Sequence, residues 1–434
     1  MRVVIVLLAA GLYWSGATRQ AEKINTDMVQ GDQSAYLKDI KGYSADPLGY
    51  VNGRNRMPIY SLLQAAAYRS DLSDAEAFRR AKRFNIVLSI LLLALLYPVL
   101  RTVLTPLSAV VLLAITAFTV WVLKAGHVQA ELLFYFLTFG LFLLMCRTLL
   151  RPTMWRGAAT GAVAGLAHLT KASILPGFAL FLIIGLLNAI VRWRRTPRGW
   201  RAARLPLVAP VVAAITFALV IAPYAMTSKR IFGQYLYNVN TTFYVWYDGW
   251  SEAVHGTKAH GDRLGWPDLP ASEIPSAQKY FRTHSALQVV KRVAHGLLTI
   301  VTGRSGYGYD PFVIGLFGFV AIAAFYRRDQ LKPLLASRWS LAAFVGAYFA
   351  VYVALYAFYA PISHGDRYVL ALFLPLMVSL AAVADRTPIA SWSLPVFGRE
   401  VRPWLLCNAL LAALLIAELP IILTRRVLTV SGDN

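Results

Sequence analysis

Cysteine, charged residues and internal repeats are all scarce in this chain of 434 residues. Its two cysteines, Cys146 and Cys407, both lie inside apolar runs, which excludes a disulfide framework in the loops and a cysteine metal site. Only 15% of the residues are charged and 58% are hydrophobic, unlike a soluble domain. This composition predicts a membrane protein. The lack of a clear repeat disfavours a transporter built from inverted repeats.

Acidic residues are few beside basic ones, 21 against 43, which leaves a formal net charge of +22. In a soluble protein such an excess would suggest a nucleic-acid partner. Between apolar spans, however, Arg and Lys orient the helices and contact anionic lipid headgroups. We therefore expect membrane lipids as partners, and no nucleic acid.

Long apolar runs recur at the length that crosses a bilayer as a helix, the structure that satisfies its own backbone in lipid. The runs lie at about 3–17, 84–100, 105–123, 129–149, 157–170, 173–191, 205–225, 311–326, 339–359, 368–384 and 404–424. They predict an all-α polytopic membrane protein with about eleven transmembrane helices. The first run could be a cleaved signal peptide, but the many later spans favour an uncleaved anchor.

Two long loops, 18–82 and 226–310, interrupt the runs, and alternating the sides puts both outside the cytoplasm. The short loops on the cytoplasmic side then carry far more Arg and Lys than the short outer loops, as the positive-inside rule requires, and long translocated loops are exempt from that rule. We divide the chain into an N-terminal transmembrane catalytic module, a large extracytoplasmic loop and C-terminal transmembrane helices, at 1–225, 226–310 and 311–434.

Both long loops carry segments that read as helices lying along the membrane face, at 58–67, 71–83 and 287–301. The second loop is also rich in aromatic residues, namely Tyr235, Tyr237, Phe243, Tyr244, Trp246, Tyr247 and Trp250. An interfacial aromatic belt is the favoured interpretation for most of them. A platform on which sugar rings stack is the alternative.

Ionisable residues gather on the extracytoplasmic side of the predicted bundle. Asp27 and Asp32 follow the first apolar run, and later outer segments carry Arg56, His127, Glu131, Lys171, His364, Asp366 and Arg367. Carboxylates at the mouth of a membrane bundle usually serve chemistry or ion handling. Carboxylates beside cations suit a reaction with a proton to remove and an anionic leaving group.

Five short motifs carry these residues in a recurring order. They are Asp32-Gln33-Ser34-Ala35-Tyr36, Arg56-Met57-Pro58, Glu131 at the start of the fourth run, Gly165-Leu166-Ala167-His168-Leu169-Thr170-Lys171, and Arg367-Tyr368 with Pro375. In order and spacing the chain resembles the polytopic glycosyltransferases of the C superfamily, especially the protein mannosyltransferase and aminoarabinose transferase branch. Gln33 departs from the pattern, because that branch has an acidic residue there.

The resemblance implies an inverting hexosyl- or pentosyltransferase that uses a polyprenyl-phosphate sugar donor. Asp32 would remove or orient the proton of the acceptor hydroxyl or phosphate, and Asp27, Tyr36 and Glu131 would help to orient substrate. The lipid phosphate would contact Arg56, Lys171, Arg367 and Tyr368. Glycan, lipid or protein could each be the acceptor.

A divalent metal is a further candidate component. Glu131 could bind one together with Asp32 or Asp27, and carboxylates suit Mg²⁺ or Mn²⁺. His127 lies four residues before Glu131 and could share a helix face with it, and His364 is a third candidate ligand; histidine would admit Zn²⁺. The competing interpretation of each histidine is an interfacial hydrogen-bonding residue.

These observations predict an integral membrane enzyme whose active site faces outside the cytoplasm. Frequent Ala and Arg and the compact length favour a bacterial plasma membrane. The alternative is a transporter or flippase of polyprenyl-linked glycans, which would also need many spans and phosphate-binding cations.

Overall fold

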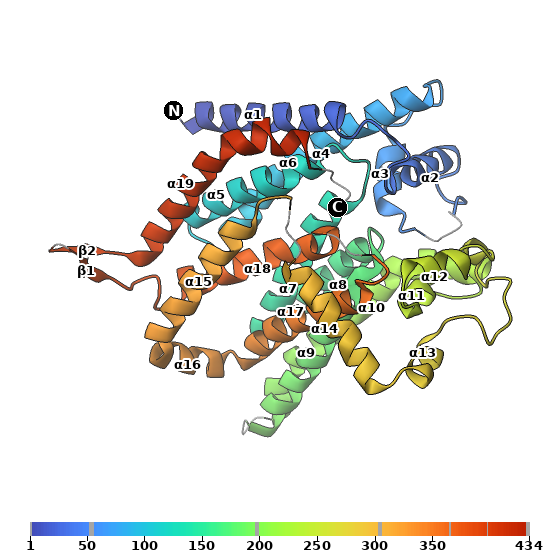
Figure 1. Ribbon diagram of the computed structural model, residues 1–434. Helices are drawn as coiled ribbons and strands as arrows, with labels where there is room; N and C mark the ends of the chain where they lie inside the picture. The colour runs from blue at the N-terminus through green and yellow to red at the C-terminus, as the bar shows by residue number, and fades with distance from the viewer. Residues whose placement is uncertain are drawn as a thin grey trace.

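The computed structural model describes residues 2–51, 56–195, 199–302, 306–363, 366–396 and 398–430, with the backbone alone at 2–3, 199–202 and 366–368. Its regular secondary structure is almost entirely helical (Figure 1). The first part of the chain forms α1 (Arg2–Lys23), α2 (Gln33–Ala45), α3 (Ile59–Ala65), α4 (Asp74–Arg101), α5 (Pro106–Ile115), the π-helical η1 (Thr116–Trp121), α6 (Val122–Lys124), α7 (Glu131–Leu150), α8 (Met154–His168), η2 (Ala172–Ile174), α9 (Leu175–Arg195) and α10 (Gly199–Phe232).

The remainder contains short loop helices followed by longer ones. They are α11 (Val239–Thr242), η3 (Tyr244–Trp246), α12 (Trp250–His255), η4 (Asp262–Leu264), α13 (Ala277–Thr283), α14 (Ala286–Thr302), α15 (Asp310–Tyr326), α16 (Arg328–Ser337), α17 (Trp339–Tyr359), α18 (Asp366–Arg386), α19 (Pro403–Thr424) and η5 (Arg426–Leu428). A small antiparallel hairpin, β1 (Leu394–Val396) with β2 (Arg399–Val401), precedes α19.

Among the described helices, eight are long and apolar enough to cross a membrane, or up to nine if α15 and α16, bent by 98°, count as one span. This confirms an all-α integral membrane protein. Every predicted apolar run lies, to within two residues, in one helix or in consecutive helical segments. The count of eleven, however, stays a prediction, since α1 and α8 are not among the eight. With 15 residues, α8 extends about 22 Å, less than the roughly 30 Å of a hydrocarbon core.

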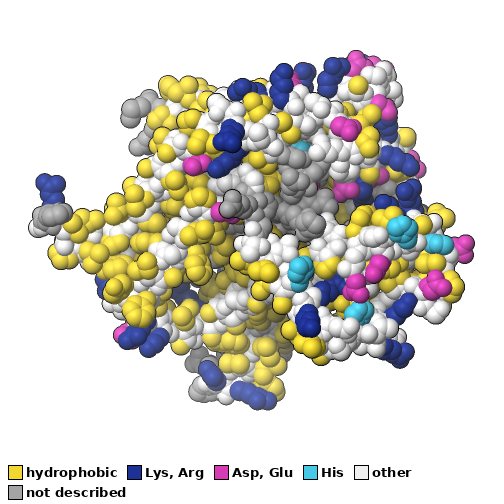
Figure 2. Space-filling model, viewed as in Figure 1, with side chains coloured by type: hydrophobic (Ala, Val, Ile, Leu, Met, Phe, Trp, Pro, Cys, Tyr) yellow, Lys and Arg dark blue, Asp and Glu magenta, His cyan; other side chains and the backbone are white. Residues whose placement is uncertain are grey.

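The short helices of the two long loops lie towards one end of the bundle (Figure 1). These are α2, α3, α11, α12 and α13, and we call this end the loop end. The opposite end carries α16 and the β1–β2 hairpin. Hydrophobic side chains dominate the surface over α15 and α19, where Ile314 and Ile416 are exposed, and charged side chains gather towards the loop end (Figure 2).

A glycine ladder holds α8 against α10. Gly157, Gly161 and Gly165 follow one another at intervals of four residues and line one face of α8. A Cβ at Gly157 would lie 2.3 Å from the Ala209 carbonyl oxygen, and one at Gly161 would lie 2.2 Å from that of Ala213. Small residues at this spacing let two helix backbones approach closely, which is how helices associate in lipid.

The first long loop differs from its prediction in one helix. The segment 59–65 is a helix, as expected, but 74–83 continues directly into the span as the first turns of α4. Ser73 and Glu76 form a capping box that starts α4 early. Lys82, buried on this extension, donates to the carbonyls of Ala21 and Asn25 at 2.6 and 2.7 Å, at the C-terminal end of α1. A cation is favoured there because the last carbonyl groups of a helix have no hydrogen-bond partner within the helix.

The second long loop has a hydrophobic core of its own, which contains Tyr237, Phe243 and Tyr244. The Tyr244 hydroxyl donates to the buried Asp262 carboxylate at 2.7 Å, and the Tyr237 hydroxyl donates to the Asp262 carbonyl. The favoured prediction of an interfacial belt is therefore wrong for these three residues, because they pack inside the loop. Tyr235 and Trp250 remain exposed.

The predicted interfacial segment 287–301 is the helix α14, which packs against α17. Arg292 anchors it: the guanidinium donates to Asp248 at 3.0 Å and to the Phe358 carbonyl at 2.8 Å, and it stacks over the Phe358 ring at 4.1 Å. Arg292 is therefore a buried link within the protein. The exposed Leu287 and Val301 form part of an apolar face that suits the predicted place at the interface.

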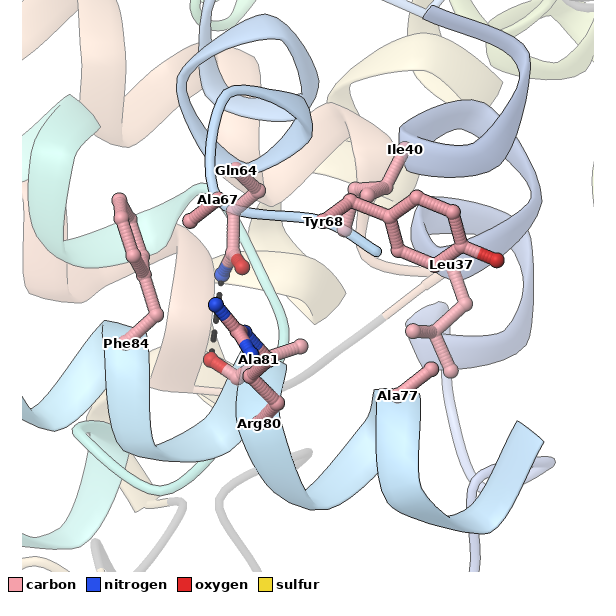
Figure 3. A pocket seen from close by; sticks show the side chains of 9 residues that line it. All are labelled: Leu37, Ile40, Gln64, Ala67, Tyr68, Ala77, Arg80, Ala81 and Phe84. Atoms are coloured by element: carbon pink, nitrogen blue, oxygen red, sulfur yellow. Dashed lines mark hydrogen bonds between the residues drawn. The ribbon is translucent and has the colours of Figure 1, made fainter. Parts of the chain in front are cut away.

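Neither of two cavities in the described structure is lined by a predicted site residue. One, between α2, α3 and α4, encloses about 10 Å³, room for about one water molecule. Gln64 lines it and donates to the Ala81 carbonyl at 3.3 Å (Figure 3). The other is a groove of about 330 Å³ between α15 and α19, lined by apolar residues such as Phe319 and Leu410.

Candidate active site

The predicted catalytic carboxylate, Asp32, lies at the N-terminal end of α2 and is paired with Arg56. The side chain of Asp32 makes no cap hydrogen bond to α2. Instead its Oδ1 accepts a hydrogen bond from an Arg56 Nη at 2.9 Å. The Asp32 side chain is 42% exposed, whereas that of Arg56 is 23% exposed. Solvent can therefore reach the Asp32 carboxylate, whereas the Arg56 guanidinium is largely covered by protein.

A second carboxylate and cation meet close by. Glu131 is the first residue of α7 and is buried, and Lys171 lies in the extended link after α8. Lys171 Nζ is 3.3 Å from Glu131 Oε1 and 5.8 Å from the centre of the Phe134 ring, one turn along α7. A buried carboxylate needs such a charge partner, because desolvation alone would favour its neutral form.

Tyr36 connects the two ion pairs. The Arg56 guanidinium lies 5.2 Å from the centre of the Tyr36 ring, whose edge meets Tyr60, also at 5.2 Å between centres. Burial raises the pKa of the Tyr36 hydroxyl, and the charge of Glu131 raises it further, while Arg56 acts in the opposite direction and Asp32 adds to the rise. The Tyr36 hydroxyl is thus within electrostatic reach of both pairs.

The backbone also ties the segments of the two pairs together. The Ile59 N–H, at the start of α3, donates to the Leu169 carbonyl at 2.9 Å. This bond joins the Arg56-Met57-Pro58 segment to the residues just before Lys171. The structure therefore brings Asp32, Tyr36, Arg56, Glu131 and Lys171 into one group, which we call the ionic cluster.

Other predicted site residues lie apart from the ionic cluster or outside the described part of the chain. The Asp27 carboxylate is exposed and accepts from the Val29 N–H at 2.8 Å; within the described residues it pairs with neither Arg56 nor Lys171. His364 lies outside the described residues. Arg367 and Tyr368 begin α18, but their side chains are not described.

Of the predicted metal ligands, Glu131 and His127 lie among the described residues and His364 does not. His127 is buried in the turn before α7, where burial lowers the pKa of its imidazole to about 3 and Lys124 adds to the effect. Its neutral form could ligate a metal, but Glu131 is already bound by Lys171. Among the described residues, no three His, Cys, Asp or Glu side chains form a group that could hold a metal ion. The described part of the cluster alone therefore does not make up a metal site.

Sequence reasoning missed the amides that support the cluster. Gln33 and Asn25 exchange two hydrogen bonds at 2.6 and 2.8 Å, and both side chains are fully buried. Asn85 donates to the carbonyls of Ala125 and His127 at 3.2 and 2.8 Å. Amides inside or beside apolar helices are a usable signal, since burying them without partners is costly. Tyr60, fully buried against Tyr36, was also missed.

The ionic cluster has the components for acid–base chemistry on an anionic substrate. An accessible carboxylate can take a proton, and a fixed guanidinium can stabilise a phosphate that gains charge. Comparison with protein-family models, with curated proteins and with solved structures finds no match to this chain.

Proposed function

We propose that the protein is an inverting glycosyltransferase that moves a hexose or pentose from a polyprenyl-phosphate donor to an acceptor outside the cytoplasm. The observation that carries the proposal is the ionic cluster, to which four separate segments contribute two carboxylates and two cations at the loop end. The order of the motifs, which resembles the glycosyltransferases of the C superfamily, supplies the reaction. The membrane would be a bacterial plasma membrane.

In the proposed reaction, the acceptor oxygen attacks the anomeric carbon of the sugar. The bond from that carbon to the phosphate oxygen breaks, and its electron pair stays on the polyprenyl phosphate. Asp32 takes the acceptor proton, a contribution of about 10²–10⁴ in rate. Arg56 and Lys171 stabilise the released phosphate, and each therefore exchanges a carboxylate partner for phosphate.

A divalent metal would assist by neutralising phosphate charge. Glu131 and His127 would be its ligands on the described side, with His364 as the third candidate. Arg367 and Tyr368 would complete the contacts to the phosphate.

Transfer by the purified protein tests the proposal against its alternative, a flippase. The full chain is reconstituted in liposomes with polyprenyl-phosphate sugars that carry a radiolabel in the sugar, and with membrane extract as a mixed source of lipid, glycan and protein acceptors. We expect label in a new acceptor together with released polyprenyl phosphate. Movement of donor between leaflets without any released polyprenyl phosphate would identify a flippase instead.

A further inference from the structure

Gln33, the residue that departs from the expected acidic motif, joins the segment of Asp32 to the segment of Glu131. It is the first residue of α2, directly after Asp32. Its Oε1 accepts from the Val128 N–H at 2.9 Å, three residues before Glu131. No part of its side chain is exposed. A single buried amide thus spans the distance between the starts of α2 and α7.

The backbone determines which way both amides of this network point. The Val128 N–H requires an acceptor, so Oε1 of Gln33 must face it. The Gly126 carbonyl requires a donor and receives Nδ2 of Asn25 at 2.7 Å. With both orientations determined, Nε2 of Gln33 donates to Oδ1 of Asn25 at 2.6 Å, and Asn25 donates back at 2.8 Å.

The same Nε2 also points at backbone oxygens of the preceding loop. It lies 3.4 Å from the carbonyls of Asp27 and Gln30. Position 33 is therefore surrounded by oxygen acceptors on one side and by donors on the other. An ionised carboxylate can only accept hydrogen bonds, so it cannot satisfy both sides.

We propose that Gln33 is a positioning residue, which sets the placement of Asp32 relative to Glu131 and Lys171 by bonding the turn before α7. This role rests on the proposed glycosyltransfer. A displacement of about 1 Å in such a group can cost about 10²-fold in rate. Gln33 itself touches neither the donor nor the acceptor.

Gln33→Glu gives the sharpest test, because a neutral carboxyl has nearly the shape of the amide. At low pH the buried Glu stays protonated, and its O–H replaces the N–H that Asn25 accepts. As the pH rises the side chain ionises, loses this donor and adds a negative charge among carbonyl oxygens. The contribution of this side chain to folding stability is therefore present at low pH, and it is lost as the pH rises through the raised pKa of the new carboxyl.

The experiment compares Gln33→Glu, Gln33→Met and the wild type at pH 5.5 and pH 8, each as the full chain in liposomes. Thermal unfolding gives the folded fraction, and transfer is expressed per folded protein. The matched control is Gln330→Glu, which adds the same group on the exposed surface of α16.

For Gln33→Glu we expect kcat close to the wild type at pH 5.5 and about 10–100-fold lower at pH 8, with a smaller change in the KM for donor. We expect Gln33→Met to lower kcat at both pH values, and we expect Gln330→Glu to leave kcat unchanged at both. A Gln33→Glu to wild-type ratio of kcat that does not change with pH overturns the positioning role, even if the melting temperature falls. If Gln33→Met does not fold, the pH dependence of kcat for Gln33→Glu decides on its own whether Gln33 is a positioning residue. Absence of transfer by the wild type refutes the proposed function instead, and the positioning role with it.

Discussion

Each cation of the ionic cluster lies against both a carboxylate and an aromatic ring. Arg56 contacts Asp32 and the ring of Tyr36, and Lys171 contacts Glu131 and the ring of Phe134. A ring attracts a cation through its electron-rich face and excludes water at the same time. In the proposed reaction, the ring would hold the cation in place while its anionic partner changes from carboxylate to phosphate.

The buried His127 makes the stability of the protein depend on pH. In the folded protein burial lowers the pKa of His127 from 6.5 to about 3, so only the unfolded chain binds a proton between these values. Stability therefore falls as the pH drops below about 6.5, by at most about 1.4 kcal/mol per pH unit. We expect the melting temperature of the wild type to fall more steeply between pH 7 and pH 5 than that of His127→Gln.

The control for this measurement is His255→Gln, because His255 is exposed in α12. Its melting temperature should follow the wild type at every pH. Equal slopes for the wild type and His127→Gln would contradict the assignment of a neutral, buried imidazole.

The sequence predicted that Asp32, Arg56, Glu131 and Lys171 lie on one side of the membrane, but not which pairs they form. Asp32, Arg56, Glu131 and Lys171 could be assigned to one side because spans alternate and charge is asymmetric. That Arg56 pairs with Asp32 and Lys171 with Glu131 depends on where α2 and α3 begin, which weak local signals do not determine. Gln33 was read as a departure from a motif, since only the packed turn before α7 reveals its partners.

At the scale of the elements, the close contact between α8 and α10 depends on the glycines of α8, which have no side chain. Gly161→Ala would put a methyl group 2.2 Å from the Ala213 carbonyl oxygen. Because this oxygen belongs to the backbone of α10, relieving the overlap would require the helix itself to shift. We expect a cost of about 1–3 kcal/mol, as for other overpacked sites. Thermal unfolding in detergent measures it as a lower melting temperature.

Gly140→Ala on α7 is the matched control, because its Cβ would meet nothing within 4 Å. Replacing Gly by Ala inside a helix then favours folding by up to about 1 kcal/mol. The two variants should shift the melting temperature in opposite directions. An equal response would mean that α8 and α10 are not in close contact.

Helices were predicted well where the apolar pattern is long, and less well at the loops. Each long run became a helix, whereas the extension of α4 to Asp74 was read as a separate surface helix. Its charged residues resemble a surface helix, yet Lys82 turns inward to the end of α1. The burial of Tyr237 and Phe243 could not be predicted either, since aromatic residues suit an interface and a loop core equally.

At the scale of the whole molecule, the fold brings the ionisable residues of the ionic cluster together, although they are far apart in sequence. Asp32 and Lys171 are separated by most of the N-terminal module, yet both belong to the ionic cluster. The surface over α15 and α19 is mainly apolar in Figure 2, as a lipid-facing surface must be.

Paired substitutions test the proposed catalytic role of Asp32 most directly. Asp32→Asn keeps an oxygen that accepts from Arg56 but removes the base, whereas Asp27→Asn changes an exposed carboxylate outside the ionic cluster. The measurement is kcat for sugar transfer from a polyprenyl-phosphate donor in liposomes, at equal amounts of folded protein. We predict a loss of about 10²–10⁴-fold for Asp32→Asn and near-normal transfer for Asp27→Asn. Normal transfer by Asp32→Asn would contradict the account.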